Sequence, residues 1–461
     1  MRKLIIYIAS GILLGATSCK KYLDIKPKGA FIPEKTSDYR LLLDETSAQQ
    51  KSNGFFNTYS MDLMLDDDMS INQFSLTYYK AAALNAFKFS ENIYTESESD
   101  VDWEAMYNQV YTCNLVTSQV LNSTGGTTAE KRQLFAEASV HRAYAYFILV
   151  NLYAKQFSSS AGTDPGVPIR KGLDFEEKLP RASVAEVYDY ILSELLSTVQ
   201  DLPAKPAIGL TNRPVKASAF ALLSKVYLFR NDAQNALRYA DSSLNNYSTL
   251  VNFNNLPPNP SFPTVLNYPQ NFQNSEMLLE KSGAMISPIV YASNALLSLY
   301  DQANDLRFPA FFFDDKQFGL SFGYFSNEWS GKSPAKGLSV PEAYLLRAEA
   351  NARLGHTDAA LSDLNTLRAN RYKTGASYQL SAGSATEALN LVKAERRREM
   401  AFRGSRWFDI RRYNTFDNAG ITVTHILPDG TYQIAPNSNR TALAIGRKYI
   451  AMNPEITQNP R

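Results

Sequence analysis

The segment LRAEANARLGHTDAAL, residues 346–361, determines how the chain is expected to fold. An earlier segment, LLSKVYLFRNDAQNAL at residues 222–237, repeats its pattern. Each has a run of small and apolar residues, then Gly355 or Asn231, and then a second run that opens with small and acidic residues. Gly and Asn readily adopt the left-handed backbone conformation that ends a helix. Each segment therefore predicts two helices joined by a tight turn.

These two helical hairpins are of the tetratricopeptide type, in which small side chains let the paired helices approach closely. Long insertions separate them, so the chain is not expected to form a regular solenoid. Helices expected at residues 136–153 and 184–199 form a third, interrupted pair, and a capping box of Ser183 and Glu186 begins the second of them. The predicted fold class is all-α: a mainly helical scaffold of tetratricopeptide-like hairpins with long irregular loops and a few short strands.

Two long segments show no helical period. Residues 252–274 are rich in Pro and Asn, and residues 311–336 carry several aromatic residues. Loops of this length are usually functional or disordered. Because binding groups tend to lie on loops that a rigid scaffold positions, such segments are where we expect ligand contacts.

The N-terminus has the order of a secretory signal. Arg2 and Lys3 precede an apolar run, and two small residues and then Cys19 follow it. The run of about 13 residues is too short to cross a bilayer, which needs roughly 20 helical residues. A Cys at this place is typical of a lipobox, so we predict that residues 1–18 are removed and that Cys19 carries a lipid anchor. The alternative is a plain cleaved signal followed by an incidental Cys.

The composition is that of a globular protein, with 44% hydrophobic and 20% charged residues. The formal net charge of +2 leaves no basic footprint for nucleic acid. The chain contains 27 Tyr and 25 Phe, which would suit an extracellular binder of sugars or peptides but also a large core. Cys113 lies among apolar residues at helical spacing and is predicted to be a buried structural thiol.

Residue patterns typical of catalysis are missing from the sequence. The three His residues are scattered without a metal-binding spacing, and neither a nucleophile elbow nor a phosphate-binding loop occurs. A pair of carboxylates brought together by folding, as in glycoside hydrolysis, stays possible. Asp66, Asp67 and Asp68 are weak candidate ligands for Ca²⁺, since three consecutive carboxylates cannot all face one ion. We therefore predict no metal site, no cofactor and no enzymatic activity.

The segment ERRREMAFRGSRWFDIRRY, residues 395–413, is unusually rich in Arg. Glu395 and Glu399 lie one helical turn apart and can pair with Arg398 and Arg403. With Trp407 and its neighbour expected to be buried beside these charges, the segment is interpreted as a structural element, not as a ligand site.

Several further segments stand in a characteristic order. They are the Trp103–Met106–Tyr107 helix start, HRAYAYFILVNLYA at 141–154, GVPI at 166–169, PRASVAEVYDYILSEL at 180–195, RPVKASAFALLSKVYL at 213–228 and YLLRAEANARLG at 344–355. Together with residues 395–413, they resemble the SusD/RagB family, outer-membrane nutrient-uptake lipoproteins of Bacteroidota. One departure is Arg403, where an acidic residue is more usual, and it puts one local ion pair in doubt.

The resemblance implies a cell-surface protein, lipid-anchored in the outer membrane, that captures oligosaccharide and delivers it to a SusC-like TonB-dependent transporter. It divides the mature chain into an N-terminal SusD-like helical region, residues 19–250, and a C-terminal SusD/RagB region, residues 251–461, both in one compact body. Two alternatives stay open: a peptide-binding, RagB-like uptake lipoprotein, and a helical-repeat adaptor that binds only its partner protein.

The candidate ligand-binding residues combine aromatic rings, which stack on the apolar faces of sugar rings, with amides that bond sugar hydroxyls. One group precedes the Trp103 helix, where the resemblance implies stacking aromatics and an Asn, and the other lies in the second irregular segment. The first group is Phe87, Phe89, Asn92 and Tyr94, and the second is Tyr324, Asn327 and Trp329.

Overall fold

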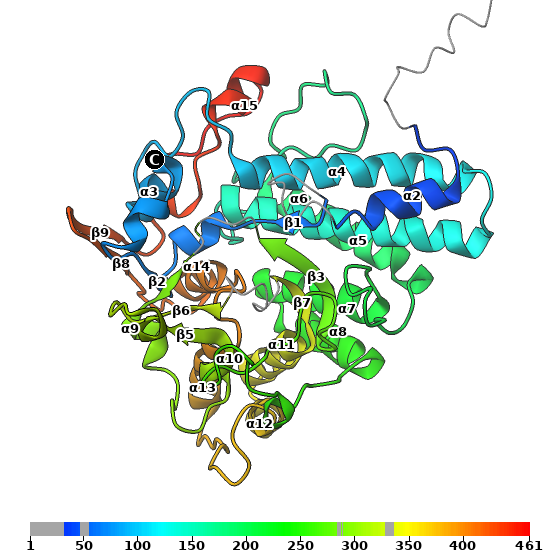
Figure 1. Cartoon of the computed structure of the whole chain (residues 1–461). Coiled ribbons are helices and arrows are strands. Elements are labelled where there is room, and N and C mark those ends of the chain that lie inside the picture. The colour runs from blue at the N-terminus through cyan, green and yellow to red at the C-terminus, as the bar shows by residue number, and fades with distance from the viewer. Residues whose placement is uncertain (1–31, 47–54, 284–286, 288, 328–335) are drawn as a thin grey trace, which may run out of the picture.

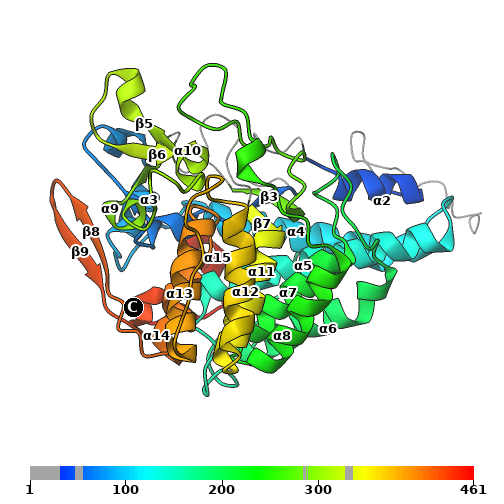
Figure 2. The same ribbon diagram turned by 90° about the horizontal axis from the view of Figure 1, so that it is seen from below.

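The computed structural model describes residues 32–46, 55–283, 287, 289–327 and 336–461. Helices form the body of the protein, and most short strands lie at one end of it, on the left in Figures 1 and 2. The predicted mainly helical fold class is confirmed. The helices are α2 (Thr36–Leu43), α3 (Ala81–Phe87), α4 (Val101–Gln119), α5 (Thr128–Tyr153), α6 (Val184–Thr198), α7 (Lys216–Phe229), α8 (Ala233–Asn246), α9 (Asn294–Leu297), α10 (Arg307–Phe311), α11 (Val340–Arg353), α12 (Thr357–Ala369), α13 (Ala385–Glu399), α14 (Arg406–Phe416) and α15 (Arg447–Met452).

The repeated segments form the expected hairpins, α7 with α8 and α11 with α12. Asn231 and Gly355 have φ angles of 62° and 83°, so both turns use the left-handed conformation. The pairs also pack on each other through a cluster of Leu228, Ala236, Leu346 and Ala350, in which the alanines let α8 and α11 approach. Figure 2 shows α6, α8, α12, α13 and α14 following one another across the molecule.

The third predicted pair is also present, because α5 packs along α6. Ser183 and Glu186 form the reciprocal capping box at the start of α6. Helix α5 is buried on all sides over its second half, between α4 and α6. Contacts between α8 and α11 join the two halves of the chain, while the boundary predicted near residue 250 stays a prediction.

Three small sheets connect segments that are distant in sequence. Strand β3 pairs with β1 in parallel and with β7 antiparallel, the second sheet has the order β2-β4-β6-β5, and β8 and β9 form a hairpin. The strands are β1 (Asn57–Thr58), β2 (Met69–Ser70), β3 (Met277–Gly283), β4 (Tyr291–Ala292), β5 (Phe312–Asp314), β6 (Tyr324–Ser326), β7 (Lys336–Ser339), β8 (Val423–Leu427) and β9 (Gly430–Ile434).

The Arg-rich segment is a buried structural element, as its sequence predicts. Glu395 pairs with Arg398 at 2.7 Å, and Arg307 approaches the same carboxylate at 2.7 Å. Burial alone would raise the pKa of Glu395, but these arginines hold it below its usual range. The pairing expected between Glu399 and Arg403 is wrong: Arg403 instead donates to the Tyr268 hydroxyl at 3.0 Å.

Two further predictions about buried residues are confirmed. Trp407 is 1% exposed and packs in the main core. Cys113 is fully buried, and burial raises the pKa of its thiol to about 12. The thiol is therefore protonated at neutral pH and has a packing role.

Candidate ligand-binding site

A group of exposed aromatic rings lies over the sheet β2-β4-β6-β5. Tyr78, Phe318 and Phe322 are 43%, 46% and 47% exposed, although large aromatic rings are usually buried. Phe74 stacks on Phe322 with ring centroids 5.8 Å apart and meets Tyr78 edge-on at 5.6 Å. We call Phe74, Tyr78, Phe318 and Phe322 the aromatic surface.

A small aromatic core supports the aromatic surface from below. Tyr291, Phe313 and Phe325 are buried and, with Val265, form a cluster of their own. Phe322 meets Tyr291 at 6.4 Å, and Phe318 meets Phe313 at 5.7 Å. The exposed rings therefore rest on strands β4, β5 and β6, which gives them a fixed base.

One buried carboxylate anchors the loop that carries Phe318 and Phe322. Asp315 is fully buried, and its Oδ2 accepts from the Tyr291 hydroxyl at 3.0 Å and from the Phe322 backbone N–H at 2.8 Å. Gly319 takes a φ of 73° at the turn, which suits a residue without Cβ. The loop therefore leaves β5 and returns to β6 with Phe322 held at its base.

The chemistry of the aromatic surface suits a sugar. Adjacent exposed rings offer apolar faces for the C–H face of a pyranose, and a ligand that covers them removes apolar area from water. Exposed polar side chains lie next to the rings in sequence and are available for hydroxyl groups. These neighbours are Gln73, Lys316, Gln317 and Ser321.

The second group of predicted residues lies beside this surface and partly beneath it. Tyr324, on β6, is half-buried and turns to the opposite face, where its ring meets Phe308 at 4.9 Å. Asn327 is buried and donates to the Ala310 carbonyl at 3.2 Å. Both side chains support the sheet in this structure. Trp329, like Cys19, lies outside the described residues.

The first group of predicted residues is mostly in the core, which corrects the expectation that its rings are exposed. Phe87 and Phe89 are 1% and 3% exposed, and both stack on His425, at 3.9 and 4.7 Å. Their ring faces are thus covered by a residue far away in sequence. Tyr94 is also buried, whereas Asn92 is exposed and accepts from Arg447 at 2.5 Å.

Asn92 and Tyr94 do come together at a small cavity of about 160 Å³. Arg447 and Arg461 line the same cavity. Helix α3, which leads to these residues, lies at the same end of the molecule as β6 in both views (Figures 1 and 2).

Two of the three weak metal candidates form ion pairs. Asp67 binds Arg406 at 2.6 Å, and Asp68 binds Arg397 at 2.7 Å. Burial and the neighbouring Asp68 raise the pKa of Asp66 well above its usual range. Within the described ranges no three His, Cys, Asp or Glu residues are grouped to hold a metal ion.

Asp100 and Asp102 have the perturbed pKa values that often mark catalytic groups. Burial raises the pKa of Asp100 to about 7 and that of Asp102 to about 6. Both side chains are fully buried, and their oxygens accept from the backbone N–H groups of Trp103 and Met61. A substrate cannot reach them. The pair instead stabilises the start of α4, at Trp103, and the segment at Met61 that packs on it.

The comparisons with known proteins identify the family. A family model described as "Starch-binding associating with outer membrane" matches residues 21–228, and the SusD family model matches residues 340–460. Together the two models cover most of the chain. The chain belongs to the SusD/RagB family. No curated protein matches it.

Solved SusD-family structures share the fold over nearly the whole chain. A SusD superfamily protein from Bacteroides thetaiotaomicron has a TM-score of 0.74 at 20% identity, covering 93% of this chain and 100% of that one. A SusD-like carbohydrate binding protein from Bacteroides vulgatus has a TM-score of 0.66 at 17% identity, covering 92% and 97%. At such identities the likeness establishes the fold alone. None of the helices in the described ranges combines the length and apolar composition that crossing a bilayer requires.

Proposed function

We propose that this SusD-family protein is a non-catalytic, cell-surface glycan-binding protein that hands oligosaccharide to a SusC-like TonB-dependent transporter. The aromatic surface carries the proposal, because three rings that are each more than two-fifths exposed rest on a rigid aromatic base. An outer-membrane starch-binding family model and a carbohydrate-binding structural relative support the choice of a sugar ligand.

The two halves of the aromatic surface differ in whether a family model matches them. Phe74 and Tyr78 lie within the first family-model match, whereas Phe318 and Phe322 lie between the two matches. We infer that the loop from Asp315 to Phe322 adapts a shared scaffold to the glycan of this chain. Trp329 follows this loop in sequence and stays a predicted stacking residue.

The proposal is tested by affinity electrophoresis of a soluble form that begins after Cys19. The protein runs on native gels with plant, host and microbial polysaccharides, and the release of reducing ends is assayed in the same samples. Retardation by a polysaccharide without release of reducing ends is the expected result. Release of reducing ends would contradict the non-catalytic function. If no polysaccharide retards the protein, the peptide-binding and partner-only alternatives are favoured. Titration with peptides then separates these two, because only the first predicts binding.

The anchor and the transporter need their own test, since both belong to the cell envelope. The full chain and Cys19→Ser are expressed in a Bacteroidota host. The unchanged chain is expected in the outer-membrane fraction together with a TonB-dependent barrel, and Cys19→Ser in the soluble fraction. Membrane retention of Cys19→Ser would contradict the lipid anchor, and purification without a barrel would contradict the delivery step.

A further inference from the structure

A concave pocket of about 260 Å³ lies between α4, α15 and residues 168–175. We call it the α4 pocket. Asn114, on α4, donates to the backbone carbonyls of Arg170 and Gly172, both at 3.0 Å, and so attaches one wall of the pocket to the helix. The described residues around the pocket include none of the four rings of the aromatic surface. The α4 pocket is therefore a separate cavity with walls that are held in place.

Aromatic side chains line the α4 pocket. Trp103 stacks on Tyr449 with ring centroids 5.9 Å apart, and Phe175 stacks on Tyr111 at 4.6 Å. Rings in such a group offer faces and edges to a further aromatic ring, which prefers offset-stacked or edge-to-face contacts. The lining therefore favours a ligand that is itself aromatic. The aromatic lining residues are Trp103, Tyr107, Tyr111, Phe175 and Tyr449.

Two of the lining side chains are open to solvent. Phe175 is 71% exposed and Met452 is 63% exposed, although both are large and apolar. A ligand can therefore reach them, and covering them removes apolar area from water. The thioether of Met adapts its shape to a neighbour and makes favourable contacts with aromatic rings. Both exposed side chains thus suit an aromatic ligand.

The charged groups at the α4 pocket compensate one another. Glu104 pairs with Lys448 at 3.1 Å and accepts from the Tyr449 hydroxyl at 2.8 Å. The other charged residues described in the lining, Arg170 and Asp174, have opposite signs. Because the pocket has no excess of either charge, a charged ligand would lose its hydration without gaining a counter-charge. The electrostatics therefore favour a neutral ligand.

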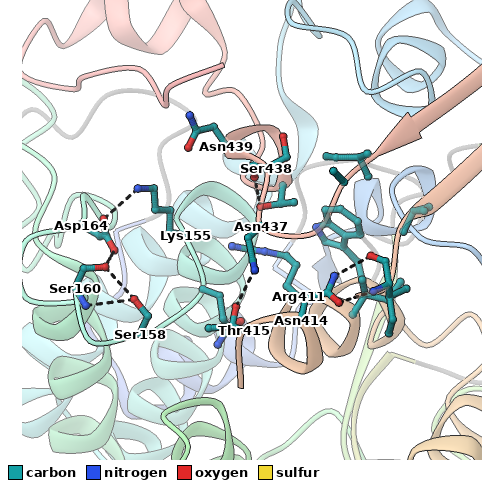
Figure 3. A pocket seen from close by; sticks show the side chains of 18 residues that line it. Lys155, Ser158, Ser160, Asp164, Arg411, Asn414, Thr415, Asn437, Ser438 and Asn439 are labelled. Atoms are coloured by element: carbon teal, nitrogen blue, oxygen red, sulfur yellow. Dashed lines mark hydrogen bonds and ion pairs between the residues drawn. The ribbon is translucent and has the colours of Figure 1, made fainter. Parts of the chain in front are cut away.

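A pocket of similar volume elsewhere in the molecule has a different lining. It lies at the C-terminal end of α14 and measures about 250 Å³ (Figure 3). Its described lining residues are mostly polar, with Lys155 and Asp164 paired at 3.4 Å, and the one aromatic residue among them, Trp407, is 1% exposed. A ligand there finds no open ring to contact. Volume alone therefore does not distinguish the α4 pocket, whereas its exposed aromatic lining does.

We propose that the α4 pocket binds a small, neutral aromatic compound of one or two rings, such as a phenol or an indole. Its volume of about 260 Å³ exceeds the roughly 150 Å³ of an apolar cavity that holds benzene. The ring of the ligand packs against Phe175 and Met452 and covers them. This site goes beyond the proposed glycan function and does not depend on it, since the pocket and the aromatic surface share no described residue.

The first test locates the ligand through Met452. The soluble chain that begins after Cys19, with ¹³C-labelled methionine methyl groups, is titrated with phenol and indole and, as non-aromatic controls, with cyclohexanol and D-glucose. The Met452 methyl signal, assigned as the one missing in Met452→Leu, should shift with the aromatic compounds through their ring currents and stay in place with the controls. Absence of a shift with both phenol and indole would overturn the proposal, and an equal shift with cyclohexanol would overturn its aromatic part.

The second test changes the exposed ring. Phe175→Leu keeps an apolar side chain and removes the ring, so the affinity for phenol, measured by calorimetry, should fall by about five-fold or more. Phe175→Tyr keeps the ring and should bind phenol as the unchanged protein does. Both variants are expected to fold because this side chain is 71% exposed, which thermal unfolding verifies. Phe322→Ala, on the aromatic surface, should leave the affinity for phenol unchanged. Unchanged affinity in Phe175→Leu, or an equal loss in Phe322→Ala, would overturn the assignment to this pocket.

Discussion

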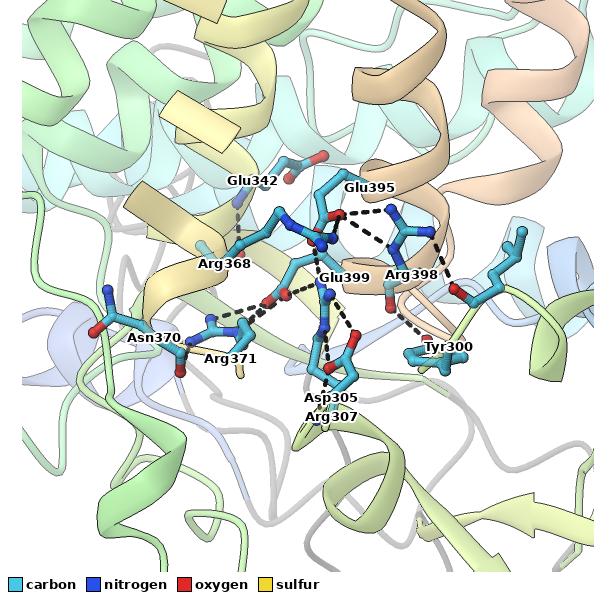
Figure 4. A network of polar contacts seen from close by, with 12 residues as sticks. Tyr300, Asp305, Arg307, Glu342, Arg368, Asn370, Arg371, Glu395, Arg398 and Glu399 are labelled. Carbon is cyan, nitrogen blue, oxygen red and sulfur yellow. Dashed lines mark hydrogen bonds and ion pairs between the residues drawn. The ribbon is translucent and has the colours of Figure 1, made fainter. Parts of the chain in front are cut away.

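Glu399 is held by two arginines in the interior of the protein. Its carboxylate accepts from Arg371 at 2.9 and 3.0 Å and from Arg307 at 3.1 Å, and all three side chains are fully buried (Figure 4). Arg371 also pairs with Glu276, and Arg307 with Asp305. The network joins α13 to the end of α12 and to the start of α10, so single residues here support three segments of the fold.

Glu399→Gln tests this network. The substitution leaves two buried guanidinium groups short of one counter-charge, and we expect the free energy of unfolding to fall by about 3–5 kcal/mol. Urea unfolding measures the change. The matched control is Asp189→Asn at the exposed pair with Arg230, where the loss should stay below about 1 kcal/mol. Equal losses in both variants would contradict the structural role of the network.

Asp100→Asn tests the pH dependence of stability. Burial and the nearby Asp102 raise the pKa of Asp100 from 3.8 to about 7, so the folded state binds its proton more tightly than the unfolded state. The contribution of this group to the free energy of unfolding is therefore full below pH 3.8 and is lost as the pH rises towards about 7. Asn retains an acceptor for the Trp103 N–H. The free energy of unfolding of the variant should therefore decline less than that of the unchanged protein between pH 3.8 and about 7. Parallel urea-unfolding curves against pH for both proteins would contradict the assignment.

Which aromatic side chains are exposed was not predictable from the sequence. Phe87 and Tyr78 both precede the Trp103 helix in sequence, but Phe87 is covered by His425, a partner from the far end of the chain. Local sequence carries no information about such a contact. The burial of Cys113 was predicted correctly because its neighbours at helical spacing are apolar, and that of Trp407 was predicted from its place beside paired charges.

At the level of helices and turns, the sequence predicts most of what is observed. Small residues and a left-handed turn residue recur in both hairpins, and these features act locally. The strands are different, since β1 and β2 have two residues each and exist only through partners more than 200 residues away. No periodicity can appear in so short a segment.

Gly355→Ala tests the hairpin turn between α11 and α12. Gly355 has a φ of 83°, and a Cβ placed on it would meet no other atom within 4 Å, so the substitution affects only the backbone conformation. We expect a loss of about 1 kcal/mol in the free energy of unfolding. Asn231→Gly at the equivalent turn, with φ of 62°, should be nearly neutral, because Asn and Gly both tolerate this conformation. A neutral Gly355→Ala, measured by urea unfolding, would contradict the role of the turn.

At the scale of the whole molecule, the binding surface arises from the assembly of distant segments. The aromatic surface joins Phe74 and Tyr78 to Phe318 and Phe322 through the pairing of β2, β4, β6 and β5. The sequence indicated the irregular segment that contains the second pair, because its aromatic residues have no helical period. It could not indicate the first pair, since only the sheet brings residues 74–78 next to residues 318–322.

The central claim is that the aromatic surface binds the glycan, and calorimetric titration with an oligosaccharide of the retained polysaccharide tests it most directly. Phe322→Ala should weaken binding by about ten-fold or more, since an aromatic anchor is lost. The matched control is Phe175→Ala, which removes a ring that is 71% exposed but stacks on Tyr111 outside the aromatic surface. Its affinity should equal that of the unchanged protein. Unchanged affinity in Phe322→Ala, or an equal loss in both variants, would contradict the account.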